Sequence, residues 1–173
     1  MMSFSQIRAA LQPLPAAALI LGASVVSLAG AWTFQALGFQ PCELCLLQRY
    51  PFYAALPLAT AAIFLARNAP PLAARLALGL LAAIFVAGAG VAVYHAGVEW
   101  KFWPGPAGCT GNFTPPSSME AFRAQLESVR VVRCDVPALR ILGLSLAGWN
   151  VPVSGGLALI AALGATAPAK LKR

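Results

Sequence analysis

The stretch "LALGLLAAIFVAGAGVAVYHAGV", residues 76–98, runs for 23 residues without one formal charge. A helix needs about 20 mostly apolar residues to cross a bilayer. This stretch therefore predicts a membrane-spanning helix by itself. Its many alanine and glycine residues suit close helix packing in lipid, because small side chains let two backbones approach each other.

Three more uncharged runs point to further spans, and they cover residues 9–41, 50–66 and 141–169. The composition agrees, because 60% of the residues are hydrophobic, 10% are charged and the mean hydropathy is +0.76. A soluble domain carries roughly a quarter charged residues. We predict an all-α membrane protein, a four-transmembrane-helix bundle that forms one integral membrane domain over residues 1–173. The expected spans lie near 14–36, 46–66, 72–94 and 149–167.

The charged residues predict the orientation of these spans. The N-terminal segment, the turn between the second and third spans and the C-terminal tail hold basic residues only: Arg8, Arg67, Lys170, Lys172 and Arg173, with Arg75 just inside the third span. All five acidic residues lie in the two other loops, 37–45 and 95–148. The positive-inside rule then puts both termini in the cytoplasm and both loops on the opposite side.

Two other interpretations of the basic residues are weaker. The net charge of +7 follows from this topology, and a nucleic-acid partner is not expected, because that would need basic residues clustered on a soluble face. Arg8, an apolar stretch and "AGA" at 29–31 also fit a signal peptide with a cleavage site. The uncharged run continues well past that point, which favours a retained span.

Four cysteines lie in the two loops that carry the acidic residues. Cys42 and Cys45 form a C-x-x-C in the first loop, and Cys109 and Cys134 lie in the long second loop. Disulfides persist on the extracytoplasmic side, and four cysteines allow three connectivities. The C-x-x-C spacing keeps two sulfurs close, and a position at a helix N-terminus favours the thiolate. This combination is typical of redox-active cysteines.

Two structural roles for the cysteines compete with the redox role. A structural zinc site usually needs a second C-x-x-C or a paired histidine motif, and the only histidine is His95, so no metal is expected. Two inert structural disulfides remain an alternative. Against inertness, "PGPAGCTGNFTPP" at 104–116 surrounds Cys109 with glycine and proline, which predicts an exposed loop that a partner can reach.

Two ionisable residues near the predicted membrane surface are candidates for function. Arg49 lies one helical turn after Cys45, on the same face. It either extends its head group to the lipid surface or holds negative charge beside a thiolate or a docked electron acceptor. His95, at the outer end of the third span, is either a headgroup-level histidine or a proton donor.

The long loop also has predicted structure. "SSMEAFRAQLESV" at 117–129 has apolar residues at helical spacing and a capping box, so we expect a short amphipathic helix on the bilayer surface. "LRILGLSLAGWN" at 139–150 is apolar but interrupted by Gly143 and Gly148. We expect it to form a second surface segment that leads into the last span.

Four motifs together resemble a known family: "PCELCLLQR" at 41–49, "YHAGVEW" at 94–100, "PAGCTGNF" at 106–113 and "RCDVPALRILGLSLAGWN" at 133–150. The chain resembles, over nearly its whole length, the DsbB-type disulfide bond formation proteins, four-helix inner-membrane enzymes of Gram-negative bacteria. The resemblance implies a multi-pass inner-membrane enzyme that reoxidises the periplasmic thiol oxidase DsbA. It also implies that the electrons pass to a membrane quinone, ubiquinone or menaquinone, which sustains disulfide formation in exported proteins.

The resemblance also assigns roles to residues. Cys42 and Cys45 match the pair next to the quinone, Cys109 and Cys134 match the pair that meets DsbA, and Arg49 matches an arginine at the quinone. The cysteine-bearing loops are then periplasmic.

The histidine match is looser, and one residue departs from the family. His95 matches a histidine near the quinone site, although the segment between it and the third cysteine varies. Leu139 stands where family members often carry tryptophan.

Three alternative functions remain open. One is a paralogous quinone-coupled thiol oxidase with a dedicated DsbA-like partner. Another is a protein similar to vitamin K epoxide reductase, which typically places its C-x-x-C after the third span. The third is a non-enzymatic membrane scaffold with structural disulfides.

Overall fold

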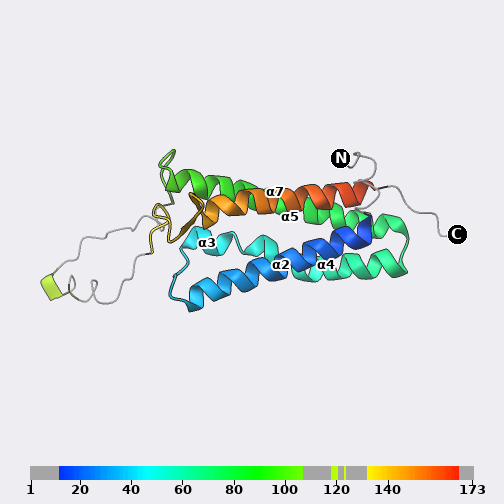
Figure 1. Ribbon diagram of the computed structural model, residues 1–173, viewed down its shortest axis with the longest axis horizontal. Helices are drawn as coiled ribbons and strands as arrows, with labels where there is room; N and C mark the ends of the chain where they lie inside the picture. The colour runs from blue at the N-terminus through cyan, green and yellow to red at the C-terminus, as the bar shows by residue number, and fades with distance from the viewer. Residues whose placement is uncertain (1–11, 107–117, 121–122, 124–131, 168–173) are drawn as a thin grey trace.

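The computed structural model describes residues 12–106, 118–120, 123 and 132–167. Within these ranges, four long helices run along the length of the molecule (Figure 1): α2 Pro13–Ala36, α4 Tyr50–Asn68, α5 Pro71–Glu99 and α7 Leu146–Thr166. A short helix, α3 Glu43–Leu47, precedes α4. The prediction of an all-α membrane protein is confirmed at the level of helical fold and membrane class.

Proline and serine fix where the long helices begin. Helices α2, α4 and α5 each have a proline in their first two positions, where the missing N–H costs nothing because it would have no partner in the helix. Helix α7 begins instead after Ser145, whose hydroxyl oxygen accepts a hydrogen bond from the Gly148 N–H at 2.9 Å. This side-chain cap satisfies one of the free N–H groups of the first turn.

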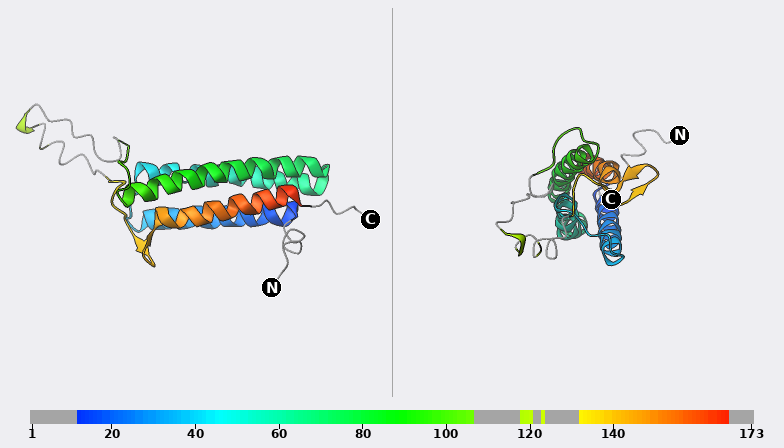
Figure 2. Two further views of the ribbon diagram at one scale, coloured as in Figure 1. Left: turned by 90° about the horizontal axis from the view of Figure 1, so that it is seen from above. Right: turned by 90° about the vertical axis from the view of Figure 1, so that its left-hand side faces the viewer.

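The four long helices form a closed ring of neighbours. Helix α2 contacts α4, α4 contacts α5, α5 contacts α7, and α7 contacts α2, and the end-on view shows a four-sided bundle (Figure 2). The core is rich in alanine, and two large side chains, Phe52 and Phe85, meet edge to face with their ring centroids 5.5 Å apart. Small residues let the helices approach closely around these rings.

Three of the helices are long and apolar enough to cross a membrane: α2, α5 and α7. Helix α4 is less apolar, because it begins with Tyr50 and Pro51 and ends with Arg67 and Asn68. The count of four spans therefore stays a prediction.

The helix bounds differ from the predicted spans at three places. The stretch predicted as one helix near 46–66 is interrupted between α3 and α4, because Pro51 has no N–H to donate to the carbonyl four residues earlier. Helix α5 continues to Glu99, so His95 lies within the helix. Gly148 does not interrupt the chain but lies in the first turn of α7.

A small hairpin connects the cysteine-bearing loop to α7. Strand β1 Arg140–Ile141 pairs antiparallel with β2 Leu144–Ser145. The turn residues Leu142 and Gly143 have φ of 53° and 85°, the positive values that a two-residue hairpin turn requires. The expected second surface segment therefore contains two short strands. The predicted amphipathic helix at 117–129 lies mostly outside the described residues.

One glycine sets the distance between α4 and α5, and its replacement is expected to destabilise the bundle. A Cβ on Gly88 would lie 2.8 Å from Cγ of Pro51, whose ring is rigid, whereas a Cβ on Gly90 would meet nothing within 4 Å. We expect Gly88→Val to cost about 1–3 kcal/mol of stability through overpacking. Gly90→Val is the matched control, and thermal unfolding of both variants in detergent measures the difference. Equal melting temperatures would contradict this packing.

Candidate functional site

Helix α3 holds the two cysteines of the C-x-x-C side by side. Cys42 is the N-cap residue, and its sulfur accepts a hydrogen bond from the Cys45 N–H at 3.2 Å. The Cys42 thiol also donates to the Cys45 sulfur, with the two sulfurs 2.7 Å apart. Both residues are free thiols. The site is therefore a reduced dithiol whose sulfurs lie close enough to form a disulfide after a small movement.

The two thiols have different surroundings. Cys42 is buried, with 4% of its surface exposed, whereas Cys45 is half-buried. The hydrogen bond from Cys42, with a smaller contribution from the positive charge of Arg49, lowers the pKa of Cys45. The same hydrogen bond and burial raise the pKa of Cys42. Cys45 is thus the member of the pair that carries the negative charge more readily.

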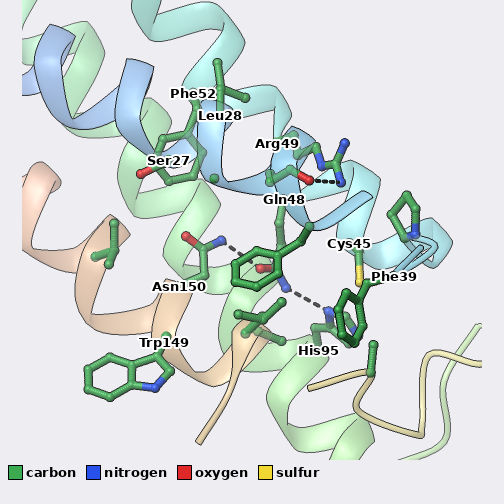
Figure 3. Close-up of a pocket in the computed structure, with 18 of the residues that line it drawn as sticks. Ser27, Leu28, Phe39, Cys45, Gln48, Arg49, Phe52, His95, Trp149 and Asn150 are labelled. Atoms are coloured by element: carbon green, nitrogen blue, oxygen red, sulfur yellow. Dashed lines mark hydrogen bonds between the residues drawn. The ribbon is translucent and has the colours of Figure 1, made fainter. Parts of the chain in front are cut away.

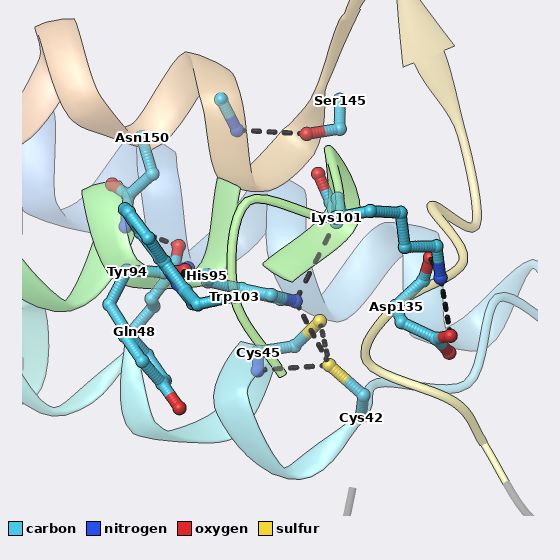
Figure 4. A network of polar contacts seen from close by, with 12 residues as sticks. Cys42, Cys45, Gln48, Tyr94, His95, Lys101, Trp103, Asp135, Ser145 and Asn150 are labelled. Atoms are coloured by element: carbon cyan, nitrogen blue, oxygen red, sulfur yellow. Dashed lines mark hydrogen bonds and ion pairs between the residues drawn. The ribbon is translucent and has the colours of Figure 1, made fainter. Parts of the chain in front are cut away.

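A chain of polar side chains leads from Cys42 into the bundle (Figure 4). His95 Nε2 lies 3.6 Å from Cys42 Sγ, and His95 Nδ1 accepts a hydrogen bond from Gln48 Nε2 at 2.8 Å. Asn150 Nδ2 donates to Gln48 Oε1 at 2.7 Å, and the Ser154 hydroxyl donates to Asn150 Oδ1 at 3.1 Å. Because Nδ1 is the acceptor, the neutral ring carries its proton on Nε2. The His95 N–H therefore lies beside Cys42, and the ring also hydrogen-bonds to the backbone of Cys134.

Three members of this polar chain were not among the predicted site residues: Gln48, Asn150 and Ser154. Asn150 and Ser154 stand four residues apart inside the last uncharged run, so they share one helix face. A polar pair on one face of a predicted span was the available signal. The contact between Gln48 and Asn150 joins residues 102 positions apart, which no local pattern indicates.

A buried carboxylate lies next to the same histidine. Glu99, one turn after His95 on α5, places Oε1 at 3.8 Å from His95 Nε2. The side chain of Glu99 is hydrogen-bonded to Ser145, and 8% of the residue's surface is exposed. Among the described residues, Glu99 Oε2 has no hydrogen-bond partner. A buried oxygen without a partner is uncommon and costly.

An apolar cavity of about 280 Å³ opens beside Cys45 (Figure 3). Helices α2 and α7 supply most of its walls. Its polar side chains include Cys45 on α3, Gln48 and Arg49 between α3 and α4, His95 on α5 and Asn150 on α7. Phe34, Phe52 and Val153 line its apolar side, and Cys45, Arg49 and His95 also border it. Cys42 does not line the cavity. Cys45 is therefore the sulfur that a ligand in the cavity would meet.

Arg49 is held at the cavity by helix α2. Its Nη1 donates to Gln35 Oε1 at 2.9 Å, and its Nη2 donates to the Ala31 carbonyl at 3.4 Å. Its guanidinium also lies over the Trp32 ring, 5.9 Å from the centroid. Among the described residues, no carboxylate forms an ion pair with Arg49. The wall of an apolar cavity therefore carries a positive charge that no described carboxylate neutralises.

The structure brings Cys134 to the C-x-x-C. Cys134 is disulfide-bonded and 1% exposed, and it packs in one buried cluster with Cys42, Leu44 and Val98. Cys109 lies outside the described residues. Of the six predicted site residues, the structure thus gathers five: Cys42, Cys45, Arg49, His95 and Cys134.

Ion pairs fasten the segment that carries Cys134 to the end of α5. Asp135 accepts from Arg133 Nε at 2.9 Å and from Arg133 Nη2 at 2.7 Å, and it also pairs with Lys101. Arg133 and then Lys101 hold the pKa of the Asp135 carboxyl well below its usual range. Because Lys101 follows α5 directly, these contacts keep Cys134 near Cys42.

The fold and the site together define a helical membrane protein built for thiol–disulfide chemistry. The family model described as "Disulfide bond formation protein DsbB" matches residues 14–164. The chain therefore belongs to the DsbB family of membrane proteins for disulfide bond formation. Comparison with curated proteins and with solved structures found no match.

Proposed function

We propose that this protein reoxidises a DsbA-like periplasmic thiol oxidase by disulfide exchange and passes the electrons to a membrane quinone. One arrangement carries the proposal: Cys134 packs against Cys42, while Cys45 faces an apolar cavity that also contains Arg49. The C-x-x-C therefore lies between a second redox-capable cysteine and a site for an apolar acceptor.

The exchange begins at the loop cysteines, which the family resemblance pairs as Cys109 and Cys134. The partner's thiolate attacks Cys109, and Cys134 leaves as a thiolate. Cys134 then attacks Cys42 in the Cys42–Cys45 disulfide, and Cys45 leaves. A leaving thiol of low pKa speeds such an exchange. Besides the Cys42 thiol of the reduced pair, a hydrogen bond from the Cys42 backbone and then the charge of Arg49 lower the pKa of Cys45, and neither of these two depends on a free Cys42 thiol.

Two further exchanges complete the transfer. The partner's second thiol displaces Cys109 and closes the partner's own disulfide. Cys109 then attacks Cys134 in the Cys134–Cys42 bond, which restores the loop disulfide and leaves Cys42 and Cys45 reduced. Each step breaks one S–S bond and forms one, so the two electrons and two protons of the partner's dithiol now reside on the C-x-x-C.

The residues around the cavity fit a quinone, either ubiquinone or menaquinone. Phe34, Phe52 and Val153 offer apolar contacts for a ring, and Arg49 offers a cation for a carbonyl oxygen. A bound quinone would accept the two electrons and two protons of the dithiol. Arg49 stabilises negative charge beside Cys45, and the His95 N–H faces the Cys42 sulfur.

We further propose that α4 also spans the membrane and that the protein resides in the bacterial inner membrane with both termini in the cytoplasm. Arg67 lies in the last turn of α4 and Arg75 near the start of α5, at the end of the bundle where these two helices meet (Figure 1). Glu43 at the start of α3, Glu99 at the end of α5 and Asp135, which pairs with Lys101, lie at the opposite end with the cysteines. This charge difference supports a periplasmic position for the cysteine end.

A topology experiment tests this orientation. A reporter that is active only in the periplasm should be active when it is inserted within 96–140 and silent when it is fused after Lys172. The expected contrast follows from the basic residues at the opposite end of the bundle. The reverse pattern would exclude a periplasmic location for the four cysteines.

Quinone reduction by the purified protein tests the proposed function. We expect reduced DsbA to drive reduction of ubiquinone or menaquinone only when the full chain is present. A Cys45→Ser variant should reduce neither quinone, because no disulfide can form in the C-x-x-C. An inert scaffold would leave both quinones oxidised with the wild-type chain. A dedicated DsbA-like partner would support the reaction where DsbA itself does not.

A further inference from the structure

We propose that the reduced protein binds one Zn²⁺ through Cys42, Cys45, His95 and Glu99, and that this metal site holds the dithiol in its reduced state. The proposal goes beyond the proposed function, because metal binding requires neither a quinone nor a thiol partner. The sequence favoured no metal, since a lone C-x-x-C supplies half of a zinc site. The fold adds the missing ligands from the end of α5.

Three of the ligand atoms already lie close together. The two cysteine sulfurs and a ring nitrogen of His95 are all within 4.8 Å of one another. Bond lengths of about 2.3 Å to sulfur and about 2.0–2.1 Å to nitrogen put S and N about 3.6 Å apart in a tetrahedral site. Cys42 Sγ lies 3.6 Å from His95 Nε2. This pair therefore has the separation that zinc needs.

The second sulfur needs a modest displacement. The two sulfurs are 2.7 Å apart, whereas tetrahedral zinc would separate them to about 3.8 Å. Cys45 is half-buried and borders the cavity, so its side chain has room to turn.

Glu99 supplies the fourth ligand and is the independent reason to expect a ligand here. Its Oε1 lies 3.8 Å from His95 Nε2, and the whole residue is buried at 8% exposure. Its Oε2 has no hydrogen-bond partner among the described residues. The atoms that lie within 4.8 Å of one another are those of Cys42, Cys45 and His95, so the Glu99 side chain must turn toward them to become the fourth ligand. A cation would give its buried oxygen a partner, and carboxylate oxygen is an accepted zinc ligand beside sulfur and nitrogen.

The polar chain behind His95 can adapt to a metal. Zinc on Nε2 requires the ring proton to move to Nδ1, so Gln48 must then accept rather than donate. Gln48 and Asn150 are both amides, each with a donor and an acceptor, and Ser154 has a hydroxyl that does both. Turning the two amides reverses the direction of the chain without breaking it. His95 would then donate Nδ1–H to Gln48, the outer-shell contact that metal-bound histidines usually make.

Metal binding would oppose oxidation of the pair. The thiols bind zinc as thiolates, so binding releases their protons to water. Both sulfurs are then committed to the metal and cannot form the Cys42–Cys45 bond. The oxidised pair offers no thiolate, so the site exists only in the reduced protein.

Co²⁺ provides a spectroscopic probe of this site. The full chain with Cys109→Ser and Cys134→Ser, reduced and held in detergent, should bind one Co²⁺ per chain and show the visible absorption of tetrahedral cobalt with thiolate ligands. Zn²⁺ should displace the cobalt. Oxidation of Cys42 and Cys45 in the same sample should abolish the absorption. No thiolate–cobalt absorption in the reduced protein would overturn the proposal.

Variants of the two ligands on α5, His95 and Glu99, test the site further. Glu99→Gln and His95→Ala should each weaken zinc binding by about tenfold or more, a loss at least as large as those seen for outer-shell partners. Glu43→Gln is the matched control, because Glu43 is an exposed carboxylate next to Cys42 in sequence. Wild-type affinity in either the Glu99 or the His95 variant would show that the four-ligand site is wrong.

Protection from alkylation gives a readout that is independent of activity. Zn²⁺ should slow the reaction of Cys42 and Cys45 with a maleimide, and a chelator should restore it. Unchanged alkylation with Zn²⁺ present would contradict a site made of these two sulfurs. None of these measurements uses quinone or DsbA, so their failure would leave the proposed function untouched.

Discussion

A Cys134→Ser variant mixed with an oxidised DsbA-like partner is expected to accumulate a mixed disulfide through Cys109. The Cys109 thiolate attacks the partner's disulfide, and no second loop cysteine remains to resolve the bond. Quenching with an alkylating agent blocks the partner's released thiol and keeps the adduct. It should appear on a non-reducing gel as a band that dithiothreitol removes.

The reciprocal Cys109→Ser variant should form little of this adduct. Cys134 is 1% exposed and packs against Cys42, Leu44 and Val98, so a thiol of a second protein has no open path to its sulfur. Exchange with an external protein requires an accessible sulfur. An adduct that forms through Cys134 in the Cys109→Ser protein, and not in the Cys134→Ser protein, would reverse the proposed order of attack.

The ion pairs that hold Cys134 in place also determine which loop cysteine the partner attacks first. Asp135 pairs with Arg133 and Lys101, and these contacts keep the neighbouring cysteine on the end of α5. The partner is then expected to exchange with Cys109, while Cys134 stays beside Cys42. The segment thus separates an intermolecular exchange from an intramolecular one.

The sequence was sufficient for the helices and for the close approach of the two C-x-x-C sulfurs, because both follow from local patterns. Long uncharged runs predict helices in lipid whatever surrounds them, and a C-x-x-C sets the distance between its own two sulfurs. A local signal also explains why the second predicted span is not one continuous helix. Pro51 interrupts the second predicted span for a backbone reason that was visible in the sequence.

The missed parts of the site depend on contacts between distant segments. Gln48 meets His95 and Asn150, which are 47 and 102 positions away. Glu99 was assigned to a loop, and its burial beside His95 became apparent only when α5 was seen to extend to that residue. The periodicity of apolar residues along a helix cannot indicate such contacts. It shows which residues share a helix face, but not which other segment that face contacts.

Replacement of Arg49 by glutamine is expected to raise the apparent KM for quinone by about 10- to 100-fold. A hydrogen bond from a charged group contributes about 1.5–3 kcal/mol, which corresponds to this range at 1.36 kcal/mol per factor of ten. The disulfide exchange among the cysteines should continue, because Arg49 makes only a small contribution to the pKa of Cys45 and donates its hydrogen bonds to Gln35 and Ala31 of α2. Quinone titrations with the reduced partner in excess measure the change.

Two further variants separate a role at the quinone from a role as an anchor. Arg49 reaches both Gln35 and the Ala31 carbonyl of α2, and lysine cannot make two such contacts with one planar group. Arg49→Lys should therefore restore the KM only in part. Arg67 is exposed and lies in the last turn of α4, whereas Arg49 caps the first turn. Arg67→Gln should therefore leave the KM for quinone unchanged. Wild-type quinone kinetics in Arg49→Gln would mean that the guanidinium only ties α4 to α2, and that the cavity needs no positive charge to hold the electron acceptor.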